Sequence, residues 1–469
     1  MSGKNFSSSA EVFSWLSQFI NLESGQTHNS FRLDRMEVLV ELAGHPEKCA
    51  PSIHIAGSKG KGSITAMITA VLEADGFRVA RYMSPHVSDI RERISIGNSF
   101  FDEQVYCAAG DEMRELIEVK VPKENNALFD PDSEGGEGPT FFEMFTLYFF
   151  LCARCSNCNA MVVETGMGGR LDATNVVDPL VSVISLIELE HTIFLGNTIE
   201  EIAGEKAGII KEEKPLVLGK QSLKAFEVFR KKTAEKHSDL IYFPGAADIS
   251  NVKIHRDGTD FTLKFNADGF PGKAASFPSP LELSIPIPGQ IQAENAGLAI
   301  LALKTAFPDI DEGAIRSGLK NVRLPARFEK ICSDPTVIID GAHTPQSAAF
   351  CCQTFCSLYG KGGILIFGCA ADKNSLAMAD ILLPCFSMII ITTPGTFKVS
   401  DAGKVFEVFE KEQPKAVQSK AEQDKVLLIR DTTEAINRAL ELGRQRGLPV
   451  LGTGSFYLAA EIREAVLKL

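Results

Sequence analysis

A glycine-rich turn with two lysines and two serines is the segment of the sequence best suited to chemistry. It follows the apolar run Ser52–Ala56 and precedes apolar residues at helical spacing over Gly62–Ala74. The residues of the turn are Gly57, Ser58, Lys59, Gly60, Lys61, Gly62 and Ser63. Glycines let backbone N–H groups curl around a polyphosphate, and a helix N-terminus adds positive potential. The turn therefore predicts nucleotide binding, with Lys61 at the β- and γ-phosphates and the Ser63 hydroxyl near Mg²⁺.

The turn departs from the standard phosphate-loop spacing G-x-x-x-x-G-K-[ST]. It is shorter, and Gly62 stands between Lys61 and Ser63. A flexible connection between a strand and a helix is the plain alternative. The apolar strand and the helical pattern that flank the turn favour the phosphate loop.

Apolar runs typical of strands alternate with helical patterns along most of the chain, which predicts a parallel sheet covered on both faces. We expect helices over Phe141–Ala153 and Ile199–Gly208, an exposed excursion over Met113–Thr140, and antiparallel strands with turns over Phe243–Pro280. The further strands that we expect are Ala160–Glu164, Leu180–Ile187, Pro215–Leu218, Thr336–Ile339, Gly363–Phe367, Met388–Thr392 and Pro449–Gly452.

The alternation pauses around Gly318–Pro325, and the length of 469 residues suggests more than one domain. We expect an α/β protein with a large N-terminal, P-loop ATPase-like domain over residues 1–320 that binds ATP on a parallel sheet. A smaller, Rossmann-like α/β domain should follow over residues 321–469.

The overall charge excludes several classes of partner. Lys and Arg number 48 against 60 Asp and Glu, so the formal net charge is −12. Bulk attraction to nucleic acid or to an anionic membrane is not expected, and an anionic ligand must meet local positive charge. The apolar run Phe141–Cys152 is broken by Glu143 and Thr146 and is too short to span a bilayer. The first residues lack the pattern of a secretory signal, so we expect a cytoplasmic enzyme.

Eleven cysteines raise the question of a metal centre or of disulfides. The odd count and the missing signal argue against disulfides. Cys152, Cys155 and Cys158 form a C-x-x-C-x-x-C run, but no fourth thiolate follows at a suitable spacing for an iron–sulfur cluster. We interpret this run as structural.

A series of motifs in fixed order resembles the folylpolyglutamate synthase/dihydrofolate synthase family, which belongs to the Mur-ligase superfamily of ATP-dependent amide-forming enzymes. The resemblance covers nearly the whole chain. Beyond the glycine-rich turn, its motifs are Ser84-Pro-His86, Arg91-Glu-Arg-Ile94, Glu164-Thr-Gly-Met-Gly-Gly-Arg-Leu-Asp-Ala-Thr-Asn175, Lys206-Ala-Gly-Ile-Ile-Lys211, Gly289-Gln-Ile-Gln-Ala-Glu-Asn-Ala296, Arg327-Phe-Glu329, Asp340-Gly-Ala-His343 and Gly454-Ser-Phe-Tyr457.

The resemblance implies ATP and two Mg²⁺ sites. Ser63 and Glu164 would hold one ion near the phosphates, with Ser84 also reaching it. His191 is the family's candidate ligand for the second ion. The family commonly has Asp before this histidine, whereas this chain has Glu190.

Lys206 matches a lysine that CO₂ carbamylates in related ligases. Carbamylation turns an ammonium into an anionic oxygen ligand and requires the neutral amine, so the site must lower the pKa of the lysine. The plain alternative is a solvated lysine on a helix. The motif favours a carbamate that serves as a metal ligand.

The resemblance also assigns residues of the C-terminal half to the nucleotide and the reacting groups. Asn295 would reach the adenine side, Arg327 a phosphate, Asp340 the ribose region, and His343 the reacting groups. A salt bridge between domains is the alternative for Arg327. The family usually has Asn after His343, whereas this chain has Thr344, which keeps a hydroxyl but lacks the two hydrogen-bonding groups of the amide.

A pterin substrate would be held by two segments and one arginine. Aromatic faces could stack on a flat heterocycle, although core packing of an apolar helix explains the first segment equally well. The residues implied are Arg32, Thr140, Phe141, Phe142, Glu143, Leu171, Asp172 and Ala173.

These observations predict an ATP- and Mg²⁺-dependent ligase that adds L-glutamate to dihydropteroate, to the γ-carboxylate of a folate, or to both, through an acyl phosphate. The residues expected to act directly are Lys61, Lys206, Arg327 and His343. The segment Thr140–Glu143 resembles that of bifunctional enzymes, which favours both activities, and the family suggests a monomer. A Mur-type cell-wall peptide ligase and a catalytically silent nucleotide-binding regulator are the alternatives.

Overall fold

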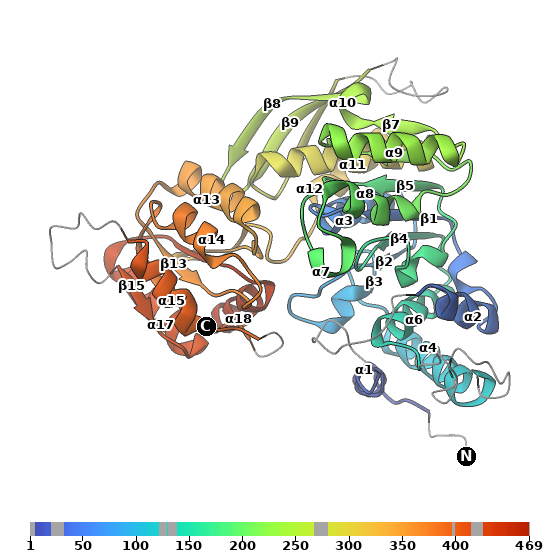
Figure 1. The fold of residues 1–469 in the computed structure, drawn as a ribbon, viewed down its shortest axis with the longest axis horizontal. Helices are drawn as coiled ribbons and strands as arrows, with labels where there is room; N and C mark the ends of the chain where they lie inside the picture. Colours follow the sequence, from blue (N-terminus) through green and yellow to red (C-terminus); the bar gives the residue numbers. More distant parts are fainter. Residues whose placement is uncertain are drawn as a thin grey trace.

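The computed structural model describes residues 5–19, 32–121, 129, 138–266, 280–395, 399–413 and 425–468. Its strands form a seven-stranded sheet, a three-stranded sheet and a six-stranded sheet. The first two lie in the part of the chain coloured blue to yellow in Figure 1, and the third lies in the orange and red part. The expected α/β fold is therefore confirmed.

The seven-stranded sheet forms the base of the N-terminal part. Its order is β3-β2-β4-β1-β5-β6-β7, and all neighbouring pairs are parallel except β2 and β3. Every residue of the central strands β4, β1 and β5 is buried, as expected when helices cover both faces. The strands are β1 (Ser52–Ala56), β2 (Val79–Tyr82), β3 (Ile94–Ile96), β4 (Ala160–Glu164), β5 (Val181–Ile184), β6 (Leu216–Leu218) and β7 (Leu240–Tyr242).

Alternate residues of β4 enter different cores on the two faces of this sheet. Val162 packs in the core that contains α3 and α11, while Val163 packs in the core that contains α6. A third core lies under α8 and α9. The helices are α1 (Ser9–Leu16), α2 (Asp34–Leu42), α3 (Lys61–Ala74), α4 (Glu103–Glu115), α6 (Phe141–Cys155), α7 (Thr192–Leu195), α8 (Ile199–Lys206), α9 (Leu223–Glu235), α10 (Phe243–Ala246), α11 (Gln290–Ala306) and α12 (Glu312–Lys320).

Short helical turns connect several of these elements. They are the 3₁₀ turns η2 (Pro46–Lys48), η3 (Ile90–Arg93), η5 (Ala173–Val176) and η6 (Ala207–Ile209), and the π-helix η4 (Leu116–Lys120).

The three-stranded sheet is antiparallel, as the pattern over residues 243–280 predicts. Its order is β10-β9-β8, with β8 (Ala247–His255), β9 (Gly258–Phe265) and β10 (Leu281–Ile285). Leu263 of β9 and Leu283 of β10 are buried in the same core as α11 and α12. This sheet therefore extends the N-terminal part at the upper edge of Figure 1.

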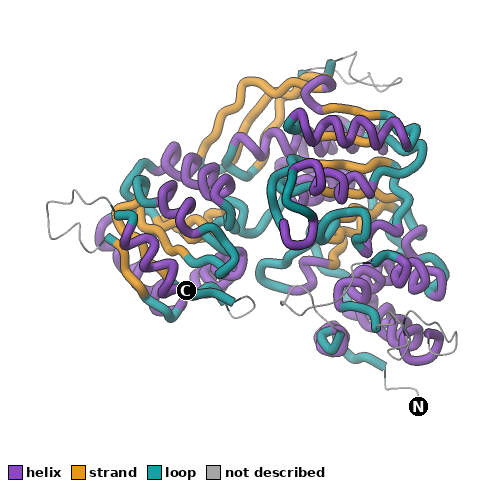
Figure 2. Tube along the Cα trace, in the orientation of Figure 1, coloured by secondary structure: helices purple, strands orange, loops and turns teal. Residues whose placement is uncertain are grey.

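The six-stranded sheet of the C-terminal part also has helices on both faces (Figure 2). In β13, Leu365 and Phe367 pack with α13, α14 and α15, while Ile364 and Ile366 pack with α17 and α18. The order is β11-β12-β16-β13-β14-β15, and only β11 is antiparallel to its neighbour. The elements are β11 (Glu329–Ser333), β12 (Thr336–Ile339), α13 (Pro345–Tyr359), β13 (Gly363–Phe367), α14 (Ser375–Leu382), β14 (Phe386–Ile391), α15 (Ala402–Lys411), β15 (Val426–Leu428), α17 (Thr432–Arg446), β16 (Val450–Thr453) and α18 (Phe456–Leu467).

The strands and helices predicted from the sequence are present, with ends that shift by a few residues. The excursion predicted from Met113 begins later, because α4 continues to Glu115 and η4 to Lys120; most of its remainder lies outside the described residues. The predicted domain boundary at residue 320 falls between α12 and β11.

None of the helices in the described ranges is long and apolar enough to cross a bilayer. The strongly apolar α6 is instead an interior helix, since twelve of its fifteen residues are buried.

The aromatic core around α6 gives a test of this packing. Phe145 is fully buried and contacts the rings of Phe13 and Phe141. Phe145→Ala should lower the free energy of unfolding by about 3–5 kcal/mol, because a cavity replaces the ring. Leu223→Ala is the control, since Leu223 is 77% exposed and should change stability by less than about 0.5 kcal/mol. Urea unfolding followed by circular dichroism measures both, and equal midpoints would contradict the packing.

Candidate active site

A cavity of about 1410 Å³ lies where the N-terminal and C-terminal parts face each other. Its walls come from the loops at the carboxyl ends of β1, β4 and β5 and from the loop that follows β12. Ligands of open α/β sheets bind at such carboxyl ends. The carboxyl ends of strands from both sheets therefore face the same cavity.

The glycine-rich turn forms one wall of this cavity, and two of its glycines have backbone conformations that L side chains rarely adopt. Gly57 has φ +144° and Gly60 has φ +88°. A Cβ on Gly57 would lie 1.8 Å from the Ser185 hydroxyl oxygen, and one on Gly60 would lie 2.5 Å from Asn295 Oδ1. The turn thus requires glycine at both positions, and Asn295 of α11 lies directly beside it.

Two lysine ammonium groups meet at one backbone carbonyl of the turn. Lys61 Nζ donates to Gly57 O at 3.0 Å, and Lys206 Nζ donates to the same oxygen at 2.9 Å. Lys206 also forms an ion pair with Glu190 at 2.9 Å and is 1% exposed. Burial lowers the pKa of Lys206 to about 8, although the charge of Glu190 opposes this shift. Burial therefore favours the neutral amine that carbamylation requires.

Glu164 ends β4 beside the start of α3. It is 3% exposed, and its Oε2 accepts a hydrogen bond from the Ser84 N–H at 3.4 Å. A Cβ on Gly62 would lie 3.6 Å from the same oxygen, so the carboxylate faces the turn that carries Ser63. Burial raises the pKa of Glu164 to about 7, against the charge of Lys61. A carboxylate beside a hydroxyl supplies the hard oxygen donors that Mg²⁺ prefers, so these residues fit such an ion.

His191 precedes α7 with φ +47° and lines the cavity. The side chain is exposed, but desolvation by the residues packed around its ring lowers its pKa to about 4, against the charge of Glu190. The ring is therefore neutral at neutral pH, the form in which histidine binds metals. Burial alone would raise the pKa of Glu190, but Lys206 and Lys61 lower it to about 2. The Glu190 that replaces the expected Asp is thus an anion that pairs with Lys206.

The loop before β11 and the end of β12 supply the opposite wall. The Arg327 guanidinium lies 4.3 Å from the centre of the Phe456 ring and forms no ion pair within the described ranges. Asp340 accepts hydrogen bonds from the Phe328 and Ala342 N–H groups, both at 2.8 Å. Burial lowers the pKa of Arg327, whereas the charges of Asp340 and Glu164 raise it. A salt bridge between domains is therefore not what holds Arg327.

His343 lines the cavity, and its hydrogen bond defines which ring nitrogen carries the proton. Its Nδ1 lies 2.9 Å from Gly341 O, and because a carbonyl can only accept, Nδ1 carries the proton. Burial lowers the pKa of His343 to about 3, with Lys59 acting in the same direction. Nε2 of the neutral ring is then an acceptor. The next residue, Thr344, caps α13, since its hydroxyl accepts from Ser347 N at 3.4 Å.

The predicted pterin segment is divided between cavity and core. Thr140 and Glu143 form the N-terminal capping box of α6, and Glu143 also pairs with Arg35 at 3.0 Å. Phe142 lines the cavity. Phe141 is buried in the aromatic core with Phe145, 5.2 Å between ring centres. The structure therefore does not bring Phe141 to the cavity, because residues one apart on a helix point in different directions.

The second predicted pterin region also lies in the cavity wall. Leu171, Asp172 and Ala173 line it together with Arg32. Asp172 accepts from Met167 N at 2.9 Å, so its carboxylate holds the loop after β4 in shape. Arg32 pairs with Asp34.

The structure thus gathers most of the predicted residues around one cavity. Lys206 and Gly57 lie immediately behind its wall. Residues that sequence reasoning left out also line it; Gln292 and Tyr457 belong to quoted motifs and could have been found there, whereas Lys220 and Gln221 carry no such signal. These additional lining residues include Arg35, Glu188, Lys220, Gln221, Gln292, Asp372 and Tyr457.

Comparison with known proteins places both parts of the chain in one superfamily. The sequence model of the Mur ligase middle domain matches residues 134–303, and that of the Mur ligase glutamate ligase domain matches residues 326–456. The dihydrofolate synthase/folylpolyglutamate synthase of Bacillus subtilis is 32% identical over 441 residues, covering 92% of this chain and 94% of that protein. The chain belongs to the folylpolyglutamate synthase/dihydrofolate synthase family. As a member of that family it is an ATP-dependent ligase.

Other members of the folylpolyglutamate synthase/dihydrofolate synthase family are also similar to this chain. The folylpolyglutamate synthase of Lacticaseibacillus casei is 31% identical over 441 residues, with 92% of this chain and 94% of that protein covered. The chain spans 47% of the length of a probable bifunctional folylpolyglutamate synthase/dihydropteroate synthase of Haloferax volcanii, at 30% identity over 431 residues.

Solved structures of the family have the same fold. Mycobacterium tuberculosis folylpolyglutamate synthase complexed with ADP and AMPPCP gives a TM-score of 0.82 at 28% identity, covering 97% of this chain and 98% of that one. A folylpolyglutamate synthase–AMPPCP–folate complex gives 0.79 at 28% identity, covering 98% of this chain and all of that one.

The glycine-rich turn gives a direct test of ATP binding. Gly57→Ala should weaken ATP binding at least tenfold, about 1.4 kcal/mol, because the new Cβ collides with Ser185. Isothermal titration calorimetry measures the affinity. Gly76→Ala is the matched control: Gly76 also has positive φ, +88°, but nothing lies within 4 Å of an added Cβ. It should cost about 1 kcal/mol of stability and leave ATP affinity intact. Equal affinities of the two variants would contradict the assignment.

Proposed function

We propose that this ligase adds L-glutamate to a pteroate or folate carboxylate, using ATP to convert that carboxylate into an acyl phosphate that the glutamate amine attacks. One observation carries the proposal: a single cavity contains the phosphate turn at one wall and the Phe142 and Leu171–Ala173 region at another. A nucleotide and a flat, apolar-faced acid can thus share one space. The names of the relatives and a neighbour solved with AMPPCP and folate support this substrate class.

We further propose that the enzyme is bifunctional and acts on both dihydropteroate and reduced folates. Several relatives carry the double name dihydrofolate synthase/folylpolyglutamate synthase. Pockets for single ligands measure about 300–1,000 Å³, so a cavity of 1410 Å³ has room for a nucleotide together with either acid. The predicted domains, residues 1–320 and 321–469, would each contribute one wall. Action as a cytoplasmic monomer stays a prediction.

Two Mg²⁺ sites follow from the residues that face the phosphate turn. Ser63 and Glu164 would hold the first ion, with Ser84 nearby. His191 and a carbamate on Lys206 would hold the second. The ions would neutralise phosphate charge as the two anionic reactants approach.

The protein's own groups bind and orient the reactants. Lys61 and Arg327 face the phosphates from opposite walls, and the planar guanidinium can donate to two oxygens at once. Asn295 lies beside Gly60, where the nucleotide must leave the turn, and Asp340 would receive the ribose. His343 Nε2 is the acceptor that orients the incoming amine.

The substrate proposal is tested by ADP release from the purified protein with ATP, Mg²⁺ and L-glutamate. We expect release to depend on dihydropteroate or tetrahydrofolate and to be absent with a muramyl-peptide acceptor and its amino acid. Lys61→Ala should abolish release, because a phosphate contact is lost, whereas Lys404→Ala, at an exposed position of α15, should not change it. Release with the muramyl acceptor alone would overturn the folate assignment, and release with one folate substrate alone would overturn bifunctionality.

The carbamate on Lys206 has its own test. Lys206→Ala should lose most turnover and regain part of it when acetate is added, because a small carboxylate can replace the missing oxygens. Lys206→Arg keeps the positive charge but cannot be carbamylated, so it should be inactive and acetate should not help. Acetate added to the unmodified enzyme is the control and should give no gain. Full turnover of Lys206→Arg would show that a cation, not a carbamate, acts there.

A further inference from the structure

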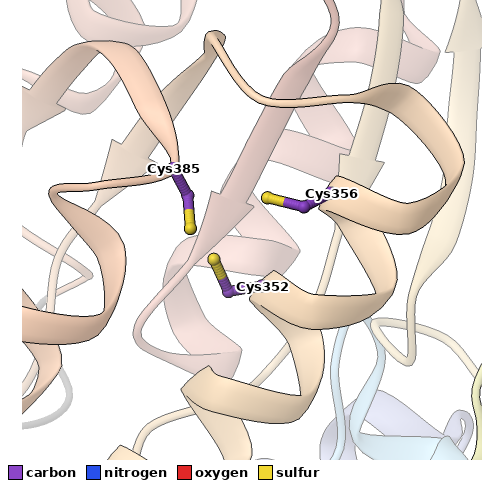
Figure 3. Close-up of side chains that lie close together, drawn as sticks. All are labelled: Cys352, Cys356 and Cys385. Carbon is purple, nitrogen blue, oxygen red and sulfur yellow. The ribbon is translucent and has the colours of Figure 1, made fainter.

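Three cysteine side chains converge in the C-terminal part, on the far side of α13 from the nucleotide cavity. Cys352 and Cys356 lie one turn apart on α13, and Cys385 lies in the connection between α14 and β14. Their sulfur atoms all lie within 4.8 Å of one another, and Figure 3 shows the three thiols pointing toward a common centre. The neighbouring Cys351 lines the nucleotide cavity instead, so the cluster is separate from the site described above.

The geometry of the cluster suits one shared ion. Sulfurs that surround a metal in a plane at about 2.3 Å lie about 4 Å apart, which small rotations of the three side chains can reach. The thiols of Cys352 and Cys385 both donate to Ile381 O, at 3.9 and 3.6 Å. Two chain segments far apart in sequence thus already direct their sulfurs to one point.

The side chains around the three thiols indicate which class of metal ion the cluster would bind. In the part of the chain that the structure describes, the three thiols are joined by no carboxylate or imidazole close enough to share an ion. Apolar side chains such as Phe355 and Leu382 surround them. Sulfur ligands without oxygen ligands favour soft metals over Mg²⁺ or Ca²⁺. Cys356 and Cys385 are half-buried and Cys352 is buried, so an ion can enter from the side of the first two.

Without an ion, the cluster consists of neutral thiols. Burial raises the pKa of Cys352 well above its usual range and raises that of Cys356 to about 11, while Lys361 opposes the latter shift. The thiols therefore do not repel one another. A metal must displace their protons, as thiolate sites do in general.

We propose that Cys352, Cys356 and Cys385 form a binding site for one thiophilic metal ion of the Zn²⁺, Cd²⁺ or Cu⁺ class, held by three sulfurs. Each thiol releases its proton to solvent as the metal–sulfur bond forms, and no electron is transferred. The ion ties α13 to the connection between α14 and β14. Because α13 carries cavity-lining residues on its other side, the ion also fixes one wall of the nucleotide site.

The test is a titration of the reduced, metal-stripped full chain with Cd²⁺ in the presence of a competing chelator. Sulfur-to-cadmium charge-transfer absorbance should rise to a break at one equivalent. Cys356→Ser and Cys385→Ser, at half-buried positions, should each weaken this first binding event at least tenfold, and Cys352→Ser should do the same. Cys155→Ser, at an exposed cysteine outside the cluster, should leave it unchanged.

Thermal melting with one equivalent of Zn²⁺ separates binding from misfolding of the variants. The unmodified chain should melt at a higher temperature with zinc, because a ligand that binds the folded state stabilises it. The melting temperatures of Cys356→Ser and Cys385→Ser should not respond to zinc. A one-equivalent Cd²⁺ signal that persists in both variants, the absence of that signal from the unmodified chain, or an equal zinc shift in all proteins would overturn the proposal.

Discussion

The rest of this structure depends on holding positive charge where two anionic reactants must meet. Two unit charges about 4 Å apart repel by about 4 kcal/mol at an effective dielectric constant near 20, and ATP presents several such charges to a carboxylate. The chain as a whole is acidic, with net charge −12, so it cannot supply this attraction from its surface. It gathers Lys61 and Arg327 around one buried space instead.

A backbone carbonyl holds the Lys61 ammonium in place before any ligand binds. Gly57 supplies that carbonyl, 3.0 Å from Lys61 Nζ, and only a glycine fits there against Ser185. Cations anchored on a carbonyl need not reorganise as charge develops, which is the basis of electrostatic stabilisation in active sites. On the opposite wall, backbone N–H groups fix the Asp340 carboxylate, whose negative charge acts on Arg327.

Local sequence patterns predicted the elements well, since the buried strand, glycine turn and helix over residues 52–74 reflect constraints within one segment. A site residue could be predicted from the sequence only where its role depends on its close neighbours in the chain or where it belongs to a recognised motif. Glu143 illustrates the difficulty: its distance of three residues from Thr140 signals a capping box, yet its partner Arg35 comes from another helix. Likewise, spacing alone did not show that Phe141 enters the core while Phe142 reaches the cavity.

The cysteines also show how little sequence spacing says about which side chains meet in the fold. The run from Cys152 to Cys158 has the spacing of a metal motif, yet within the described residues its thiols do not gather around one point. Cys152 is buried in the core of α6, whereas Cys155, the last residue of that helix, is exposed. The cluster of Cys352, Cys356 and Cys385 has no such signature, since its third member is 29 residues beyond the second and arrives through the pairing of β13 with β14. Only the sheet order brings it to α13. A metal site of this kind forms only when the strand order brings distant cysteines together, so a search for sequence motifs does not find it.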